Sequence, residues 1–504
     1  MANILDYMDW RGDLSFDISP FNEVDNLILS VLSYLDFEGI VPGSSQTVGI
    51  RTASRLYREK EATRVGKPEE MTAFSESFDS HIPELLHKAA ASRRFGKTKM
   101  SHYVSRSDME KDKQMAAVTF LLEDGTKYVS FRGTDDSLTG WKEDFDLSYM
   151  DATAGQKDAV KYLNCTLRNN HAPVRVGGHS KGGNFAVFAA GFCSPKIRDQ
   201  IFIVYSNDGP GFKPSTAKSP EMREVRKKAV KYSPEYSAIG VILTNVVRAH
   251  LVQSDMKGVD QHNAFSWQVQ GTHFVEADER DPGSILFDRT MNSWINGESE
   301  ENRKLFINTL FGMFTDAGVN TLSEVTNNKV QSTRIVWNAL RSMPKKSRNK
   351  FLQIFLHLEQ SRRKAQAENL AENLAENLRA GRTDSVVAGR QSTEKTAAEA
   401  QPLAEKVAAA NQPLAEKLGI AAQPLVEKVA AASQPLAEKV AAASQPLAEK
   451  MAAASQPLAE KVAAASQPLA EKMAAASQPL AEKVNAMMRS IFHIEDPQET
   501  GEDW

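Results

Sequence analysis

The chain lacks several features that would assign it to a specialised class of protein. It has 2 cysteines in 504 residues, Cys165 and Cys193, which are too few for a disulfide framework. No run of about 18 apolar residues occurs, so no transmembrane helix is predicted. The net charge is −3, without the basic excess of a nucleic-acid-binding domain. The first residues, MANILDYMDWRGDL, lack the basic and apolar regions of a secretory signal. Because so few cysteines suit a reducing compartment, we expect a cytoplasmic protein.

Motifs for bound cofactors are also missing from the sequence. There is no cluster with metal-ligand spacing, no Walker-type phosphate loop and no Gly-rich dinucleotide fingerprint. We therefore expect neither a metal nor a cofactor. The composition that is present, 41% hydrophobic and 25% charged, is ordinary for a globular protein, and the length predicts more than one structural region.

Composition divides the chain into consecutive regions. The first mixes glycine, proline, aromatic residues and short β-type runs, as an α/β domain does. Apolar residues then recur at spacings of three and four, as in ENRKLFINTLFGMF, and predict helices that pack on the first region. The expected domains are 1–280 for the α/β domain, 281–364 for the helical extension, 365–400 for a charged repeat and linker, 401–486 for an 11-residue repeat, and 487–504 for an acidic tail.

The 11-residue repeat, SQPLAEKVAAA and its variants, recurs from Gln401 to Gln478. Alanine, leucine, glutamate and lysine favour helix, whereas proline is tolerated only in a first turn. We expect a string of short helices broken or kinked at each proline. Two interpretations stay open for this tail. It is an exposed helical spacer, or its thin stripe of Leu and Val or Met serves self-association, coiled-coil formation or surface attachment.

Strand signals in the first region lie at 115–122, 127–132, 173–178, 201–206 and 246–253. Helical segments such as 155–170 and 183–193 separate several of them, which favours a largely parallel sheet with crossover helices. The Asp124-Gly125 pair between the first two strands predicts a tight hairpin.

The stretch VRVGGHSKGGN places Ser180 between Gly178 and Gly182, after a β-type run and before the helical NFAVFAAGF. This strand–turn–helix context is typical of a nucleophile elbow, in which small residues two positions before and after the serine avoid a collision. We expect Ser180 to be a nucleophile. The main-chain N–H of Lys181 would face the developing oxyanion at the N-terminus of the helix.

A serine nucleophile needs a base, which should follow it in the chain. His262 lies in a loop between two strands, in GVDQHNAFSWQV, and is the preferred candidate. His250 lies inside the apolar run VVRAHLVQ, where a structural histidine is the better interpretation, and His273 lies near a strand end. The alternative for His262 is a loop histidine without a role.

Two acids are candidates for orienting the base. Asp208 ends the strand IFIVYS and enters a Gly-Pro-Gly turn, although it could serve only to stabilise that turn. Asp255 follows the next strand and is the rival. A second oxyanion donor is expected after an earlier strand, and the N–H of Thr134, with its hydroxyl assisting, meets this expectation. The alternative is an ordinary polar strand exit.

At these residues the chain resembles class three lipases of the α/β-hydrolase superfamily. VSFRGTDDSLTGWKEDFDL is similar to their Phe-Arg-Gly-Thr segment with its following Trp and Asp-Leu, and GGHSKGGN to their elbow, with Lys181 where Leu is usual. The chain resembles more closely the Mbeg-like family, a bacterial domain family of unknown function related to those lipases. That resemblance covers roughly residues 1–360 and includes the N-terminal stretch, SNDGPGF and QHNAFSWQV.

The resemblance implies Ser180 as nucleophile, His262 as base, and the Thr134 and Lys181 amides as oxyanion donors. The acid departs from the lipase pattern, which would put it in KYSPEYSAIG, where Glu235 is the acid present. Asp208, Asp255 and Glu235 therefore remain candidates, and Asp208 is preferred because it lies at the end of a strand. We expect an α/β-hydrolase that cleaves an ester of a lipid or another acyl compound. The alternative is a catalytically impaired binding or scaffolding protein that assembles through its repeats.

Overall fold

The computed structural model describes residues 2–63, 78–108, 113–135, 137–321, 324–325 and 329–379. Within these ranges, one compact unit comprises residues up to 342 together with 354–362, and a second comprises 343–353 and 363–379. The repeats expected at 401–486, the tail at 487–504 and most of the expected linker lie outside the described residues. The domain boundaries drawn from the sequence remain predictions.

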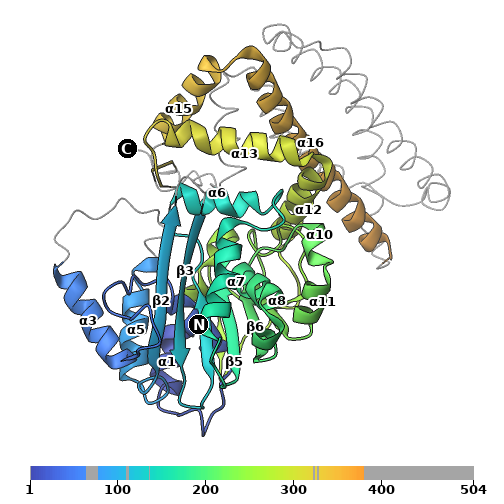
Figure 1. Cartoon of the computed structure of the whole chain (residues 1–504). Helices are drawn as coiled ribbons and strands as arrows, with labels where there is room; N and C mark the ends of the chain where they lie inside the picture. The colour runs from blue at the N-terminus through green and yellow to red at the C-terminus, as the bar shows by residue number, and fades with distance from the viewer. Residues whose placement is uncertain are drawn as a thin grey trace, which may run out of the picture. The chain divides into compact units, whose positions relative to one another are not determined.

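A mixed eight-stranded sheet organises the first unit, and its strands follow one another in sequence order (Figure 1). They are β1 (Val48–Gly49), β2 (Lys99–Asp108), β3 (Lys113–Leu121), β4 (Lys127–Phe131), β5 (Val174–His179), β6 (Ile201–Asn207), β7 (Ala229–Pro234) and β8 (Ala249–Val252). The pairings from β1 to β4 are antiparallel and those from β4 to β8 are parallel. The predicted α/β fold with a largely parallel sheet is confirmed.

Three strands of the sheet were not predicted from the sequence: the two-residue β1, and the longer β2 and β7. β2 reads KMSHYVSRSD and is too polar to stand out as a buried strand. β7 reads AVKYSP and carries a lysine, Lys231, at a buried position. The turn predicted at Asp124-Gly125 joins β3 to β4, and Gly125 adopts a positive φ of 81°, which a tight hairpin requires.

Side chains alternate between the two faces of the sheet, so each face has its own core. On β3, Val118 and Phe120 belong to one hydrophobic cluster, whereas Met115 and Ala117 belong to the other. The second cluster is covered by α7 (Ala154–Thr166), α8 (Lys181–Phe192) and α11 (Pro220–Arg226). The candidate active site lies at the edge of this sheet where the parallel strands end.

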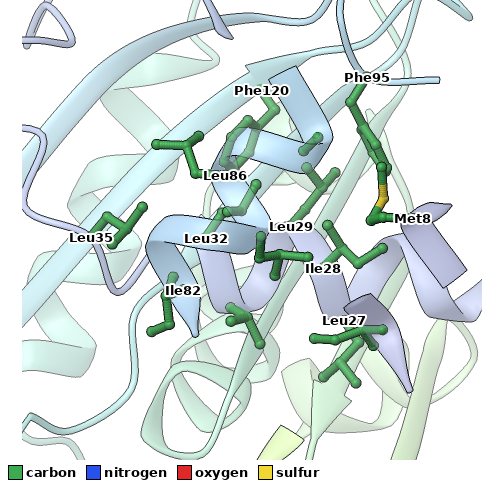
Figure 2. Packing of buried hydrophobic residues seen from close by; sticks show 14 of the residues in the cluster. Met8, Leu27, Ile28, Leu29, Leu32, Leu35, Ile82, Leu86, Phe95 and Phe120 are labelled. Carbon is green, nitrogen blue, oxygen red and sulfur yellow. The ribbon is translucent and has the colours of Figure 1, made fainter. Parts of the chain in front are cut away.

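The first cluster is covered by α1 (Ile4–Arg11), α2 (Glu23–Leu32) and α5 (Ile82–Ala91), and α3 (Ile50–Thr63) packs on α5. Figure 2 shows Leu27, Ile28, Leu29 and Leu32 of α2 packed with side chains from α1, α5 and β3. α2 begins with a capping box, in which Asn22 and the side chain of Asp25 satisfy each other's main-chain N–H groups. A fixed start and an apolar face thus place α2 against the sheet.

Shorter elements complete the α/β region: α6 (Leu138–Asp146), α9 (Pro195–Arg198), α10 (Pro214–Ala217), two 3₁₀ helices at Gly258–His262 and Ala264–Ser266, and the small hairpin of β9 (Val269–Gln270) and β10 (His273–Phe274). The region expected to be helical contains α12 (Pro282–Gly297), α13 (Glu300–Thr315), α15 (Lys329–Ser342) and α16 (Lys345–Arg379). None of the helices in the described ranges combines the length and apolar character needed to cross a bilayer.

Candidate active site

The segment between β5 and α8 is a tight turn centred on Ser180. Ser180 adopts φ 57° and ψ −134°. Residues with a side chain rarely take such a conformation, and it costs about 1–3 kcal/mol. The Ser180 N–H donates to the carbonyl of Asn207 at 2.9 Å, and the Ser180 carbonyl accepts from the N–H of Gly183 at 2.9 Å. The turn therefore holds Ser180 at the N-terminus of α8, where the helix dipole favours negative charge.

Packing requires the two glycines that flank this turn. A β-carbon on Gly178 would lie 2.4 Å from the carbonyl carbon of Gly182, and one on Gly182 would lie 2.1 Å from the carbonyl oxygen of Phe131. The atoms that a side chain would meet belong to the main chain and cannot rotate away. β4, the turn and α8 are thus in direct main-chain contact, as in a nucleophile elbow.

Two main-chain N–H groups beside the turn, those of Thr134 and Lys181, donate to no acceptor within the described ranges. Thr134 follows β4 and Lys181 is the first residue of α8. The strand exit lies close to the turn, because a β-carbon on Gly133 would be 2.7 Å from the carbonyl oxygen of His179. The Thr134 hydroxyl donates to the carboxylate of Asp144, so this side chain is already engaged. The groups of the site that are able to bind an anion are therefore the main-chain N–H groups of Thr134 and Lys181.

The side chain of Lys181 turns away into a buried polar cluster. It is 1% exposed, and its Nζ donates to the carbonyl of Gly140 at 3.2 Å and lies 3.5 Å from Oε2 of Glu143. Glu143 also accepts from two main-chain N–H groups, at 2.7 and 3.0 Å. Burial raises the pKa of the neighbouring Asp144 to about 6, although the charge of Lys181 opposes this shift. Glu143 thus explains how a lysine is accommodated immediately after the serine.

Asp208 and His262 meet at the edge of the sheet where the parallel strands end. Asp208 directly follows β6, has a positive φ of 49°, and is fully buried. Its Oδ2 lies 2.6 Å from Nδ1 of His262, the last residue of the first 3₁₀ helix. Burial alone would raise the pKa of Asp208, but the hydrogen bond and charge of His262 hold that pKa below its ordinary value. An ionised Asp208 fixes the ring of His262 and leaves its Nε2 as the basic nitrogen.

A second histidine, His179, connects this pair to the serine turn. Its ring centroid lies 4.6 Å from that of His262, and its Nε2 lies 2.9 Å from the carbonyl oxygen of His262. A carbonyl only accepts, so Nε2 carries the proton and Nδ1 accepts from the hydroxyl of Tyr34 at 3.0 Å. Burial and the nearby His262 lower the pKa of His179 to about 3. His179 is therefore a neutral, fixed donor that holds the main chain of His262 beside the turn.

The sequence did not single out His179 or Tyr34. His179 lies within the quoted GGHSKGG stretch, but no local pattern shows which main-chain group its ring would reach. The serine hydroxyl itself forms no hydrogen bond with any described residue, so contact between the turn and the pair runs through His179. This hydroxyl is therefore available to a bound molecule.

The other candidate acids and bases lie in different surroundings. The side chains of Asp255 and Glu235 form no hydrogen bond or ion pair with the described residues, and Asp255 is exposed. His250 is an exposed residue of β8 whose ring lies 5.5 Å from that of Tyr232. His273 lies on β10 with a side chain that is 72% exposed. Of the acids weighed from the sequence, Asp208 is the one in contact with His262.

The described residues contain no group of three or more His, Cys, Asp or Glu side chains placed to hold a metal ion. The arrangement therefore consists of a strained serine, a histidine–aspartate pair and main-chain donors. Such groups are suited to nucleophilic attack with general acid–base assistance.

Residues 89–312 match the family model described as Mbeg1-like, which confirms the resemblance to that family over this part of the chain. The matched part contains every candidate site residue, from Thr134 to His262. A search of curated proteins found no match.

Among solved structures, the chain is similar at 14% identity and a TM-score of 0.25 to M37 lipase, over 34% of this chain and 67% of that one. It is similar at 15% identity and a TM-score of 0.27 to a Rhizomucor miehei lipase in complex with its propeptide, over 38% and 73%. A third likeness, at 12% identity and a TM-score of 0.28, is to a mutant form of MDLA from Penicillium cyclopium, over 51% and 86%.

Proposed function

We propose that this Mbeg1-like segment is a serine hydrolase that cleaves a carboxylic ester of a lipid or of another acylated small molecule. The observation that carries the proposal is the backbone of Ser180, whose positive φ of 57° is maintained at the N-terminus of a helix. Such strain persists only where the surrounding structure imposes it, and it is concentrated at functional sites. A serine nucleophile needs a base, and His262 is suited to this role because Asp208 holds its Nδ1 at 2.6 Å.

In the proposed reaction, Oγ of Ser180 attacks the ester carbonyl carbon while Nε2 of His262 takes the hydroxyl proton. The negative charge that forms on the carbonyl oxygen is stabilised by the N–H groups of Thr134 and Lys181. His262 then gives its proton to the leaving alcohol, and an acyl group remains on Ser180. Water, activated by His262, releases the carboxylic acid and restores the serine. Asp208 stays ionised throughout and stabilises the imidazolium form.

A fluorophosphonate probe tests this proposal because it reacts covalently with an activated serine. We expect the purified chain to be labelled and Ser180→Ala to lose the label. A matched control is Ser219→Ala, since Ser219 is a helix-capping serine outside the site whose hydroxyl accepts from the N–H of Met222. Folded protein that takes no label, or labelling that survives in Ser180→Ala, would contradict the proposal. A panel of acyl esters of different chain length would then define the substrate.

One observation favours a second candidate, a catalytically impaired protein that uses this fold for binding or scaffolding. The Ser180 hydroxyl is not hydrogen-bonded to His262 in the described structure. In ligand-free hydrolases this contact is often long and forms only with substrate. The labelling experiment separates the two candidates. The cytoplasmic location and an assembly role for residues 401–486 remain predictions from the sequence.

A further inference from the structure

The carboxylate of Asp208 is held from two sides by different partners. Oδ2 contacts His262, whereas Oδ1 accepts from the hydroxyl of Ser237 at 2.6 Å. Ser237 is 2% exposed, and its Oγ also accepts from the N–H of Gly240 at 2.9 Å. With its accepting side occupied, the Ser237 hydroxyl has its proton directed at Asp208. A hydroxyl that donates to a buried carboxylate makes a charge-assisted hydrogen bond, which is stronger than a neutral one.

The loop that carries Ser237 lies very close to Asp208. A β-carbon on Gly240 would be 2.2 Å from Oδ1 of Asp208, so only glycine permits this approach. The buried amine of Lys231 joins the two segments, since it donates to the carbonyl of Gly209 at 2.7 Å and to that of Gly240 at 2.6 Å. The loop is therefore fixed against the residue that follows Asp208 in the chain.

Helix α12 fixes the main chain of Ser237 from the other side. The hydroxyl of Ser284, in the first turn of α12, donates to the carbonyl of Ser237 at 2.8 Å and accepts from its N–H at 3.2 Å. Ser284 is fully buried. The N–H of Asp281, the cap of α12, donates to the carbonyl of Glu235 at 3.0 Å. The same loop reaches the base, because the N–H of Tyr236 donates to Oε1 of Gln261, the neighbour of His262, at 2.8 Å.

We infer that Ser237 is a positioning residue for the Asp208–His262 pair and that Ser284 of α12 holds Ser237 in place. The inference rests on the proposed function for its catalytic meaning. It assigns the start of the helical region, beyond residue 280, to the catalytic apparatus. The order of contacts is Ser284 to Ser237, Ser237 to Asp208, and Asp208 to His262.

The first test compares Ser237→Ala, Ser237→Thr and Ser284→Ala in the full chain. A matched control is Ser332→Ala, which also loses a buried hydroxyl, one that donates to the carbonyl of Val325 at 2.6 Å. We expect the fluorophosphonate labelling rate to fall about ten- to a hundredfold in Ser237→Ala, the range for a lost hydrogen bond to a charged group. Ser237→Thr retains a hydroxyl and should recover most of the rate, and Ser284→Ala should be slowed less. Ser332→Ala should keep the parent rate.

A second measurement does not depend on reaction at Ser180. The carboxyl ¹³C resonance of Asp208, identified by its loss in Asp208→Asn, reports the ionisation of this group as pH falls. The pKa of Asp208 should be higher in Ser237→Ala than in the parent chain or in Ser332→Ala, because the ionised carboxylate has lost a hydrogen-bond donor. An unchanged titration would overturn the inference even if the chain is labelled. Absent labelling with a shifted titration would overturn the proposed function and keep the Ser237 contact.

Thermal unfolding of each variant separates positioning from stability. If the labelling rate and the unfolding temperature fall by the same amounts in Ser237→Ala and in Ser332→Ala, Ser237 has only a structural role. If Ser284→Ala labels at the parent rate, α12 does not act through Ser237, and that part of the inference fails.

Discussion

The serine turn and the Asp208–His262 pair differ in how they are held. The turn consists of five consecutive residues, 178–182, and is shaped by glycines packed against main chain. The two members of the pair lie 54 residues apart in the chain and are held by hydrogen bonds from other segments. The turn is therefore held by steric packing, and the pair is held by hydrogen bonds. The first should respond to added volume, and the second to the loss of single donors.

The two parts share one feature, the edge of the parallel sheet. β5 and β6 pair in parallel, and His179 lies opposite Asn207 at their ends. The next residue on each strand, Ser180 or Asp208, has a positive φ, 57° or 49°. Each strand is thus followed by a residue with a strained backbone, and both residues are candidates for the active site. They lie at the edge of the sheet where ligands bind in parallel α/β proteins. Four predictions test how differently the two parts are built.

The largest effect is expected from Asp208→Asn, which keeps the size of the acid but removes its charge. The rate of Ser180 labelling or ester turnover should fall on the order of 10⁴-fold, because the base loses both its orientation and its stabilising charge. Asp255→Asn is the control, since that side chain is exposed, and it should react at the parent rate. Loss of rate in Asp255→Asn alone would show that the pair is not the one in the structure.

Gly182→Ala should destabilise the fold by about 1–3 kcal/mol, because the added methyl group collides with the main chain at Phe131. Gly312→Ala is a control in which no atom lies within 4 Å of the new methyl group, and it should stabilise α13 by up to about 1 kcal/mol. Urea unfolding followed by circular dichroism measures both. Equal urea midpoints of unfolding for the two variants would contradict the explanation that steric packing of glycine shapes the turn.

The pH dependence of stability should reveal His179. Its pKa is lowered to about 3 by burial, so between pH 3 and the ordinary value of 6.5 the unfolded chain binds a proton that the folded chain does not. Stability is then lost as pH falls through this window, by up to about 1.4 kcal/mol per pH unit from this group. His179→Phe keeps a ring but cannot titrate, and its unfolding free energy should fall less steeply between pH 6.5 and 4. Parallel slopes for parent and variant would contradict this.

The smallest effect is expected from Tyr34→Phe, which removes only the hydroxyl that donates to Nδ1 of His179. A neutral hydrogen bond of this kind contributes about 0.5–1.5 kcal/mol, so labelling should slow by roughly two- to tenfold. Tyr232→Phe is a suitable control because its hydroxyl donates instead to Glu23, at 2.9 Å, on the first core. If both variants are labelled at the same rate, the hydrogen bonds that connect Tyr34 through His179 to His262 do not support the reaction.

Sequence patterns predicted the parts of the fold that depend on neighbouring residues. The runs that became β3, β4, β5 and β6 are apolar and bounded by turn residues, so their period and limits are visible locally. β7 was missed because its buried lysine, Lys231, looks like a surface residue until three acceptors from distant loops surround its amine. Tertiary contacts, absent from any local window, reverse such a preference.

For the site, the order of residues along the chain determined the serine turn, since two glycines and a strand–helix boundary leave the backbone few other conformations. It also left three acids open, Asp208, Asp255 and Glu235, because distance along the chain does not measure distance in space. Only the tertiary structure decided which acid contacts His262, and it added His179, Tyr34 and Ser237 to the surroundings of that pair. A hydrogen bond needs two atoms about 3 Å apart, and for segments this distant only the packing of sheet and helices brings them together.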